Sequence, residues 1–304
     1  MTKLKTTAGQ AAPGRSEAGG TSLQETAWAK VNLTLQVTGR RADGYHELAS
    51  LVVFADCGDR LTFAPSDELS LTLQGPFAGS LPATADNLVL RAARGIAELT
   101  GRPLPCAITL TKTLPVAAGI GGGSADAAAV LRALCPRAGL SLEDSGLRDL
   151  ALALGADVPV CLASQPTLLS GIGERLEPLA GLPPLALVLA NPGSPLSTAE
   201  VFKARQGPFG QVAAQAPPTA TEAFLEWLAE RPNDLEAAAR SVYPEVARVV
   251  ESLAATEGCR LARMSGSGAT CFGLYESRAE AERAAFSLAE REPKWWVKAA
   301  GLRL

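Results

Sequence analysis

The chain has 304 residues, of which 47% are hydrophobic and 19% charged, and its formal net charge is −3 at pH 7. This length allows a full hydrophobic core and is typical of one large or two medium domains. The charge excludes the basic field that nucleic acid and anionic lipid require, and no apolar stretch approaches the roughly 20 residues that cross a bilayer, so we expect neither partner.

The amino-terminal elements follow a polar tail. Residues 1–25 are rich in Gly, Ala, Ser and Thr, which cannot repay their ordering entropy by burial, and we predict that they are disordered. Lys3 and Lys5 are not followed by an apolar core, so we expect that the tail is not a secretory signal. Alternating apolar residues predict a half-buried strand over residues 30–38, and a second strand over residues 47–55 follows a polar turn.

The next elements lead to a glycine-rich segment. We predict a strand over residues 69–73, a helix over residues 87–99 with Asp86 as its N-cap, and a strand over residues 106–111. Residues 115–125 then carry four glycines, at positions 119, 121, 122 and 123, and run directly into a helix. The chain therefore passes from a strand through glycines to a helix start, which is an order typical of phosphate-binding loops.

Two predicted helices follow the glycine segment, and a linker then separates them from a second set of strands and helices. Helices are predicted over residues 125–134 and 143–154, and a proline-bearing linker over residues 178–184. The remaining predicted elements are a strand (185–190), two helices (222–229 and 244–255), two strands (260–264 and 271–275), a helix (279–290) and a strand (296–302). This mixture predicts two α+β domains, residues 26–180 and 181–304, with a cleft between them.

Six cysteines occur without any C-x-x-C pair, and there is a single histidine. Cys106, Cys161 and Cys271 lie in apolar runs, where a free thiol behaves as a small hydrophobe. We therefore predict reduced cysteines and a cytoplasmic protein. One histidine cannot build a multi-histidine metal site, and we predict no metal held by the protein alone.

The strongest chemical signal is the glycine segment, residues 115–125, which reads Pro-Val-Ala-Ala-Gly-Ile-Gly-Gly-Gly-Ser-Ala. Glycines let a backbone approach a ligand closely, and the start of the following helix offers unpaired N–H groups to a phosphate. The segment lacks the Gly-Lys-Ser/Thr ending of a P-loop, and its spacing is not the dinucleotide fingerprint. Lys112 stands just upstream, and Ser124 can offer a hydroxyl to a phosphate or a metal ion. The alternative is a glycine turn without a ligand.

Asp157 and Lys30 are the candidate reacting pair. Asp157 follows a predicted helix end and precedes an apolar run that suggests a strand, and a carboxylate there can accept a proton from a substrate hydroxyl. On local sequence alone, an aspartate such as Asp157 more often caps a turn, and a lysine such as Lys30 is more often a solvated surface residue. If the two side chains meet, the ammonium stabilises negative charge on the attacking oxygen.

Two further segments offer ligand contacts. Tyr45 and His46 follow a turn and provide an aromatic face and a hydrogen-bonding edge, although each alone is more often part of turn packing. Residues 264–269, Met-Ser-Gly-Ser-Gly-Ala, join two predicted strands. They are either a tight connection or a second glycine loop that closes over the phosphates.

Five segments, taken in order, resemble motifs of the GHMP kinase superfamily, named for galactokinase, homoserine, mevalonate and phosphomevalonate kinases. They are residues 29–33 (Ala-Lys-Val-Asn-Leu), 39–48 (Gly-Arg-Arg-Ala-Asp-Gly-Tyr-His-Glu-Leu), 115–125, 155–160 (Gly-Ala-Asp-Val-Pro-Val) and 264–269. One glycine loop would be weak support, whereas this ordered set spans nearly the whole chain after residue 26. The resemblance implies a two-domain α+β fold, with an amino-terminal domain similar to ribosomal protein S5 domain 2 and a ferredoxin-like carboxy-terminal domain.

The resemblance also implies roles for single residues. Lys30 and Asp157 match a catalytic pair, with Asp157 as the base toward a substrate hydroxyl. The positions that match the ATP site are Asn87, Lys112, Pro115, Val116, Ala117, Ala118, Gly119, Ile120, Gly121, Gly122, Gly123, Ser124 and Ala125. Those that match the substrate side are Asn32, Tyr45, His46, Asp157, Thr198 and Phe202, with Tyr45 stacked on a cytosine. Ala125 departs from the pattern, since relatives often have a second serine there, but the backbone N–H remains.

Residues 44–48, Gly-Tyr-His-Glu-Leu, are similar to those of superfamily members that phosphorylate the C2 hydroxyl of a polyol linked to cytidine diphosphate. The implied cofactors are ATP and Mg²⁺, with Ser124 as the one suggested magnesium ligand, and the expected assembly is a monomer or weak homodimer. Two alternatives are another GHMP kinase, whose substrate carries no base, and a nucleotide-sensing protein that has lost turnover. The presence of both Lys30 and Asp157 counts against the nucleotide-sensing protein, because a protein without turnover has no chemical need for the pair.

Overall fold

The fold is given by a computed structural model that describes residues 22–81, 84, 86–210 and 216–304. The first strand, β1 (Leu23–Asn32), begins inside the stretch predicted to be a disordered tail, so that prediction is wrong for its last residues. Residues 1–21 of the predicted tail lie outside the described residues. The carboxyl end of β1 is buried, which places Lys30 near the end of a strand rather than at its head.

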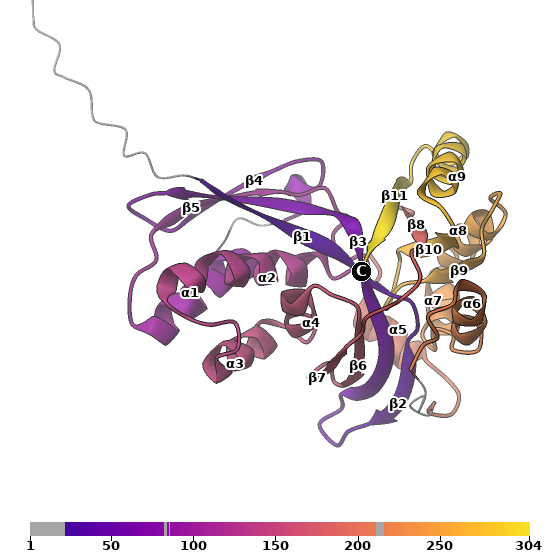
Figure 1. Cartoon of the computed structure of the whole chain (residues 1–304), viewed down its shortest axis with the longest axis horizontal. Helices are drawn as coiled ribbons and strands as arrows, with labels where there is room; N and C mark the ends of the chain where they lie inside the picture. Colours follow the sequence, from indigo (N-terminus) through magenta and orange to yellow (C-terminus); the bar gives the residue numbers. More distant parts are fainter. Residues whose placement is uncertain (1–21, 82–83, 85, 211–215) are drawn as a thin grey trace, which may run out of the picture.

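Strand β3 (His46–Pro65) organises the first half of the chain (Figure 1). It pairs antiparallel with β1, β2 (Gln36–Arg40), β5 (Cys106–Thr111) and β6 (Thr167–Gly171). β4 (Ser70–Gln74) lies parallel to β5, and β7 (Arg175–Pro178) lies antiparallel to β6. We predicted that this strand ends at residue 55. It continues to Pro65 because Asp59, which resembles a strand breaker in the sequence, is buried and hydrogen-bonded.

A layer of helices covers one face of this part of the sheet (Figure 1). It contains α1 (Leu88–Thr100), α2 (Gly122–Leu134), the short 3-10 turn η2 (Pro136–Ala138), α3 (Ser145–Leu154) and α4 (Val158–Ala163), while η1 (Ala78–Ser80) follows β4. α2 contacts α1, α4 and β1, and most of its residues are buried. Because alanine side chains are small, these neighbours approach α2 closely, and this packing holds the helix in place.

Two helix starts differ from the prediction. The N-cap of α1 is Asn87, whose side chain accepts the backbone N–H of Val89 at 3.0 Å, and not Asp86. α2 begins at Gly122, inside the glycine segment, rather than at residue 125. Gly121 stands at its N-cap in the left-handed conformation, with φ 65°, which turns the chain directly into the helix.

Two strand predictions also differ. The predicted strand over residues 30–38 is divided, because Thr34 accepts the N–H of Leu51 through its hydroxyl at 2.9 Å and leaves the ladder between β1 and β2. After Asp157 the chain forms helix α4 and not a strand, since Pro159 suits the first turn of a helix.

The second half forms an antiparallel sheet in the order β11–β8–β10–β9. Its strands are β8 (Ala186–Asn191), β9 (Leu261–Met264), β10 (Cys271–Tyr275) and β11 (Trp296–Arg303), and α8 (Glu245–Ala254) and α9 (Arg278–Arg291) pack on it. This order confirms the ferredoxin-like prediction. The long connection after β8 holds α5 (Thr198–Ala204), α6 (Thr221–Ala229) and α7 (Glu236–Val242). Sequence analysis missed α5 and α7 because each has only 7 residues, too few for a clear period.

The two halves join along the last strand. β11 pairs with β8 and, at its end, with β3 through Leu302 opposite Ala55 and Arg303 opposite Phe54. In Figure 1 the two halves therefore meet side by side at β3 and β11. The domain boundary that we predict between residues 180 and 181 falls in the connection between β7 and β8. Within the described ranges, no helix has both the length and the apolar character needed to cross a membrane.

Candidate active site

A cleft follows the line where the two halves meet. Its inner cavity has a volume of about 440 Å³, and an outer cavity of about 910 Å³ adjoins it. The two cavities are neighbours, because they share the lining residues Leu48, Ala156, Ile172, Thr198 and Phe202. The inner cavity is bordered by the end of β1, the glycine segment, the start of α2 and the second glycine loop, residues 264–269, which leads from β9 toward β10.

Lys30 and Asp157 meet in the wall of the inner cavity. Lys30 Nζ lies 2.8 Å from Asp157 Oδ1, and the two side chains are 5% and 41% exposed. The lysine is therefore not a solvated surface residue. Asp157 stands at the N-cap of α4, yet its side chain makes no capping hydrogen bond within the described part of the chain. The structure thus places a carboxylate open to the cleft beside a shielded ammonium.

The glycine segment packs around Lys30. The backbone N–H of Lys30 donates to Ile120 O at 3.0 Å, and a Cβ on Gly121 would lie 3.1 Å from Lys30 Cβ. The residues of the segment that line the inner cavity are Ala117, Ala118, Gly119, Gly121, Gly122, Gly123 and Ser124. The first residues of α2 are among them, and their N–H groups have no carbonyl partner within the helix. The segment therefore presents backbone donors to the cleft, as a phosphate site requires.

The second glycine loop holds the glycine segment from the other half of the chain. The hydroxyl of Ser265 donates to Gly119 O at 3.1 Å and accepts the backbone N–H of Asn32 at 3.1 Å. Ser265 is fully buried. Residues 264–269 therefore connect β9 to β10 and hold the glycine segment, and their closure over the phosphates stays a prediction.

Asn32 lines the inner cavity with an unsatisfied acceptor. Its Nδ2 donates to Ser50 Oγ at 2.7 Å, whereas its buried Oδ1 has no hydrogen-bond partner among the described residues. A buried acceptor left without a donor costs about 1–3 kcal/mol.

Helix α5 closes the cleft from the second half. Ser197 caps it by accepting the N–H of Glu200, and the Thr198 hydroxyl lies 2.7 Å from the Ser267 hydroxyl in the second glycine loop. Thr198 and Phe202, one helical turn apart, both line the inner and the outer cavity.

The outer cavity is lined by aromatic rings from both halves. Tyr45 is 61% exposed, and the His46 ring stacks on the Phe202 ring with centroids 4.8 Å apart. Burial and the nearby guanidinium groups of Arg40 and Arg205 lower the pKa of His46. A neutral imidazole stacked on a phenyl ring leaves the outer cavity suited to a flat ligand group.

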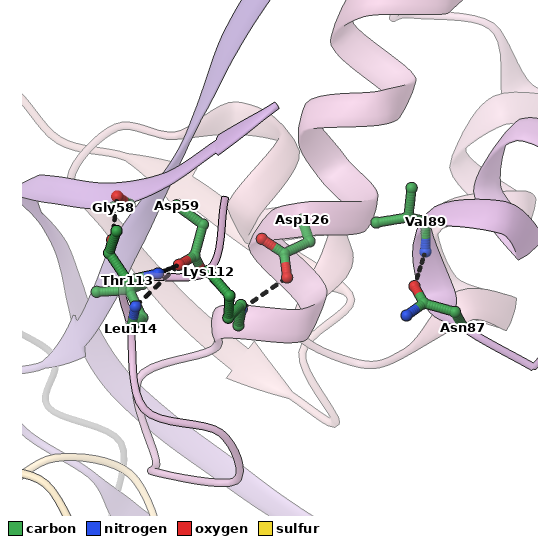
Figure 2. Close-up of polar contacts among 8 residues, drawn as sticks. All are labelled: Gly58, Asp59, Asn87, Val89, Lys112, Thr113, Leu114 and Asp126. Carbon is green, nitrogen blue, oxygen red and sulfur yellow. Dashed lines mark hydrogen bonds and ion pairs between the residues drawn. The ribbon is translucent and has the colours of Figure 1, made fainter. Parts of the chain in front are cut away.

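Some residues predicted for the ATP site line neither cavity of the cleft. Those that do not line either cavity are Asn87, Lys112, Pro115, Val116, Ile120 and Ala125. Asn87 caps α1, and the next residue, Leu88, lines the inner cavity. Lys112 is 1% exposed and pairs with Asp59 and Asp126, as Figure 2 shows.

Sequence reasoning missed three buried residues that support the site, Asp59, Asp126 and Ser265. One signal was available for Asp126, because it is a lone carboxylate within the apolar first turns of α2. Ser265 belongs to a motif that had been singled out, but its partners lie in the other half of the chain. For Asp59 the local sequence carries no such signal.

Two family models match the chain. The GHMP kinases N terminal domain matches residues 87–165, and the GHMP kinases C terminal model matches residues 220–294. The fold and the cleft, with these matches, define a small-molecule kinase of the GHMP class.

Curated relatives show which family of GHMP kinases the chain belongs to. A 4-diphosphocytidyl-2-C-methyl-D-erythritol kinase of Paramagnetospirillum magneticum is 53% identical over 283 residues, which cover 93% of this chain and 99% of the relative. A protein of the same name from Parvibaculum lavamentivorans is 53% identical over 285 residues, which cover 92% of this chain and 98% of that relative. The chain belongs to the 4-diphosphocytidyl-2-C-methyl-D-erythritol kinase family.

Solved structures agree with this assignment. A crystal structure of 4-(cytidine 5'-diphospho)-2C-methyl-D-erythritol kinase superposes with a TM-score of 0.75 at 40% identity, covering 92% of this chain and 99% of that one. Homoserine kinase from Cytophaga hutchinsonii superposes with a TM-score of 0.65 at 20% identity, covering 95% of this chain and 97% of that one, which shows the shared fold alone. The predicted two-domain GHMP kinase fold is confirmed.

Proposed function

We propose that this chain transfers the γ-phosphoryl group of ATP to the C2 hydroxyl of 4-diphosphocytidyl-2-C-methyl-D-erythritol. The products are the 2-phosphate and ADP, and the reaction belongs to isoprenoid precursor biosynthesis by the methylerythritol phosphate pathway. The observation that carries the proposal is the Lys30–Asp157 pair, 2.8 Å apart, which lines the same inner cavity as the start of α2. The names of the relatives supply the substrate.

Asp157 is the proposed base. The C2 hydroxyl is a tertiary alcohol and a crowded, poor nucleophile, so the protein must supply in-line positioning and a proton acceptor. The carboxylate takes the hydroxyl proton as the oxygen attacks the γ-phosphorus. The bond from that phosphorus to the bridging oxygen breaks, and ADP leaves. Lys30 lies within 2.8 Å of the carboxylate and stabilises negative charge on the attacking oxygen.

The glycine segment is the proposed site for the ATP phosphates. The N–H groups of Gly122, Gly123 and Ser124 begin α2 and line the inner cavity, where they and the helix dipole favour an anion. Their position beside Lys30 brings the γ-phosphate toward the reacting pair.

Magnesium fits this site as a partner of ATP. Within the described residues, no group of three or more His, Cys, Asp or Glu side chains is placed to hold a metal ion. Mg²⁺ commonly takes most of its ligands from phosphates and water. The Ser124 hydroxyl, which lines the inner cavity, is the oxygen that this chain would add. When bound, the ion neutralises charge on the phosphates.

The outer cavity is the proposed site for the cytidine end. Tyr45 offers an exposed ring to the base, and the stacked pair of His46 and Phe202 borders the same cavity. Binding energy from a remote base can hold the reacting hydroxyl in place. Asn32 lines the inner cavity between the two ends, and its unsatisfied Oδ1 supports a role in accepting a hydrogen bond from a substrate hydroxyl.

We further propose a cytoplasmic enzyme that works as a monomer or weak homodimer, without nucleic-acid or membrane partners. Its six cysteines are all free, which suits a reducing compartment. The net charge of −3 supports the proposed lack of nucleic-acid binding.

The deciding experiment measures ATP-dependent phosphorylation of 4-diphosphocytidyl-2-C-methyl-D-erythritol, with homoserine and mevalonate as parallel substrates. We expect turnover of the cytidylyl substrate alone. Turnover only of another alcohol would keep the ATP site and overturn the role of the outer cavity. A protein that binds ATP and phosphorylates none of the three would contradict the proposed function and favour a nucleotide-sensing role.

A further inference from the structure

Three charged side chains are buried behind the glycine segment, outside the cleft (Figure 2). Lys112 Nζ lies 2.5 Å from Asp59 Oδ2 and 2.6 Å from Asp126 Oδ2. The side chains of the lysine and the two aspartates are 1%, 0% and 3% exposed. Desolvating ions is costly, and apolar residues of similar volume often give equal or greater stability. Stability alone therefore gives no reason for this cluster.

The cluster holds both ends of the glycine segment. Asp59 belongs to β3, Lys112 directly follows β5, and Asp126 belongs to α2. Asp59 Oδ1 also accepts the backbone N–H groups of Thr113 and Leu114, at 2.6 Å and 2.8 Å. The chain that enters the glycine segment is thereby fixed to β3, and the helix that leaves it is fixed to the same ammonium.

The ammonium of Lys112 lies directly behind the first residue of α2. A Cβ on Gly122 would lie 3.2 Å from Lys112 Nζ, a contact tighter than ordinary packing, so glycine leaves the room for this approach. Gly122 itself lines the inner cavity. One backbone position thus separates the positive charge of Lys112 from the proposed phosphate site.

Lys112 also balances the negative charge of the two aspartates behind the proposed phosphate site. Burial is the main cause that raises the pKa of Asp126 to about 7, so the ammonium faces the full charge of Asp59 and only part of the charge of Asp126, which keeps the repulsion of ATP small. Burial disfavours the charged lysine, but Asp126 and Asp59 outweigh that effect and raise its pKa, so the ammonium persists. Asp126 keeps one oxygen, Oδ1, without a hydrogen-bond partner among the described residues.

We propose that Asp126 and Asp59 are positioning residues for ATP, which act through Lys112 to set the glycine segment and the first N–H groups of α2. Neither carboxylate lines the cleft. The inference rests on the proposed function, because it takes the glycine segment as the phosphate site. It assigns to Lys112 a place behind the phosphates rather than a direct contact with them.

The test compares Asp126→Ala and Asp126→Asn with Glu25→Ala and Glu25→Gln as matched controls. Glu25 pairs with Arg132 at 3.3 Å, and Arg132 lies in the last turn of α2. Both pairs therefore tether the same helix, but only the Asp126 pair lies at its glycine end. Calorimetry measures the Kd of a non-hydrolysable ATP analogue, steady-state assays measure both KM values and kcat, and thermal unfolding measures Tm.

We expect Asp126→Ala to raise the Kd of the analogue and the KM for ATP about tenfold, while the KM for the cytidylyl substrate stays within about twofold. Asp126→Asn keeps an acceptor for Lys112 and should raise both ATP constants by a smaller factor. The Glu25 variants should lower Tm and leave the ATP constants unchanged. If Asp126→Ala does not fold, Asp126→Asn decides the question by itself.

Wild-type ATP constants in both Asp126 variants would overturn the inference. An equal rise of the two KM values would also overturn it, because that pattern indicates a general loosening of the fold. Wild-type protein that binds the analogue but does not phosphorylate the cytidylyl substrate contradicts the proposed function, and the Kd comparison still decides the positioning role. Wild-type protein that does not bind the analogue contradicts both.

Discussion

Lys30 Nζ and Asp157 Oδ1 lie 2.8 Å apart, although Lys30 comes from the buried end of β1 and Asp157 from the N-cap of α4. The glycine segment covers the lysine, so its charge is shielded from solvent on that side. The carboxylate stays open to the cleft. A proton acceptor needs this combination, since a substrate must reach it while its charge partner stays fixed.

Replacing Asp157 tests the base directly. Asp157→Asn keeps the size of the side chain and removes its ability to take a proton, so we expect kcat to fall by about 10²–10⁴-fold. The Kd of an ATP analogue and the KM of the cytidylyl substrate should change little. Steady-state kinetics and calorimetry check this prediction, and normal turnover would remove Asp157 from the role of base.

Truncating Tyr45 tests the outer cavity. Tyr45→Ala removes an exposed ring, and base–aromatic stacking contributes about 1–3 kcal/mol, so the KM of the cytidylyl substrate should rise about tenfold or more. The KM for ATP should not change. The control is Phe286→Ala on α9, because Phe286 is 68% exposed and lines neither cavity. Equal losses for both substrates of the Tyr45 variant would indicate a folding defect instead.

Removing the Ser265 hydroxyl tests the contact between the two halves. Ser265→Ala leaves the buried N–H of Asn32 and the carbonyl of Gly119 without this partner, which should lower the free energy of unfolding by about 1–3 kcal/mol. Urea titration measures this change. Ser241→Ala is the control, since among the described residues its hydroxyl bonds only to Ala238 O within α7, and its loss should lower the free energy of unfolding less. Equal stability of the two variants would contradict the bridging role.

The raised pKa values of the cysteine thiols predict how fast these thiols react at pH 8. Burial is the main cause that raises the pKa of Cys57, Cys135 and Cys161 to about 12, and it also raises the pKa of the other thiols. A raised thiol pKa means less thiolate at pH 8, and thiolate is the reactive form. A colorimetric disulfide reagent should therefore react slowly with the native protein at that pH. Six equivalents should react at once after unfolding, and fast reaction of the native protein would contradict the burial.

Local signals determined much of this protein from the sequence alone. The strand over residues 106–111 and the strand over residues 271–275 match β5 and β10 at both ends. The glycine segment stands out in the local sequence, whereas Asp157 and Lys30 were singled out as a pair by the resemblance to GHMP kinase motifs. The ordered motifs also pointed to the GHMP kinase fold, which the comparisons confirm.

Tertiary structure decided the features that depend on distant partners. β3 runs on through Asp59 because Lys112 and two backbone N–H groups satisfy that carboxylate. Lys30 could be a surface residue by its sequence, and it is buried because the glycine segment folds over it. A short window of sequence encodes periodicity and turn chemistry, but whether a buried charge is stable depends on which groups surround it. Those groups come from strands and helices that only the folded chain brings together.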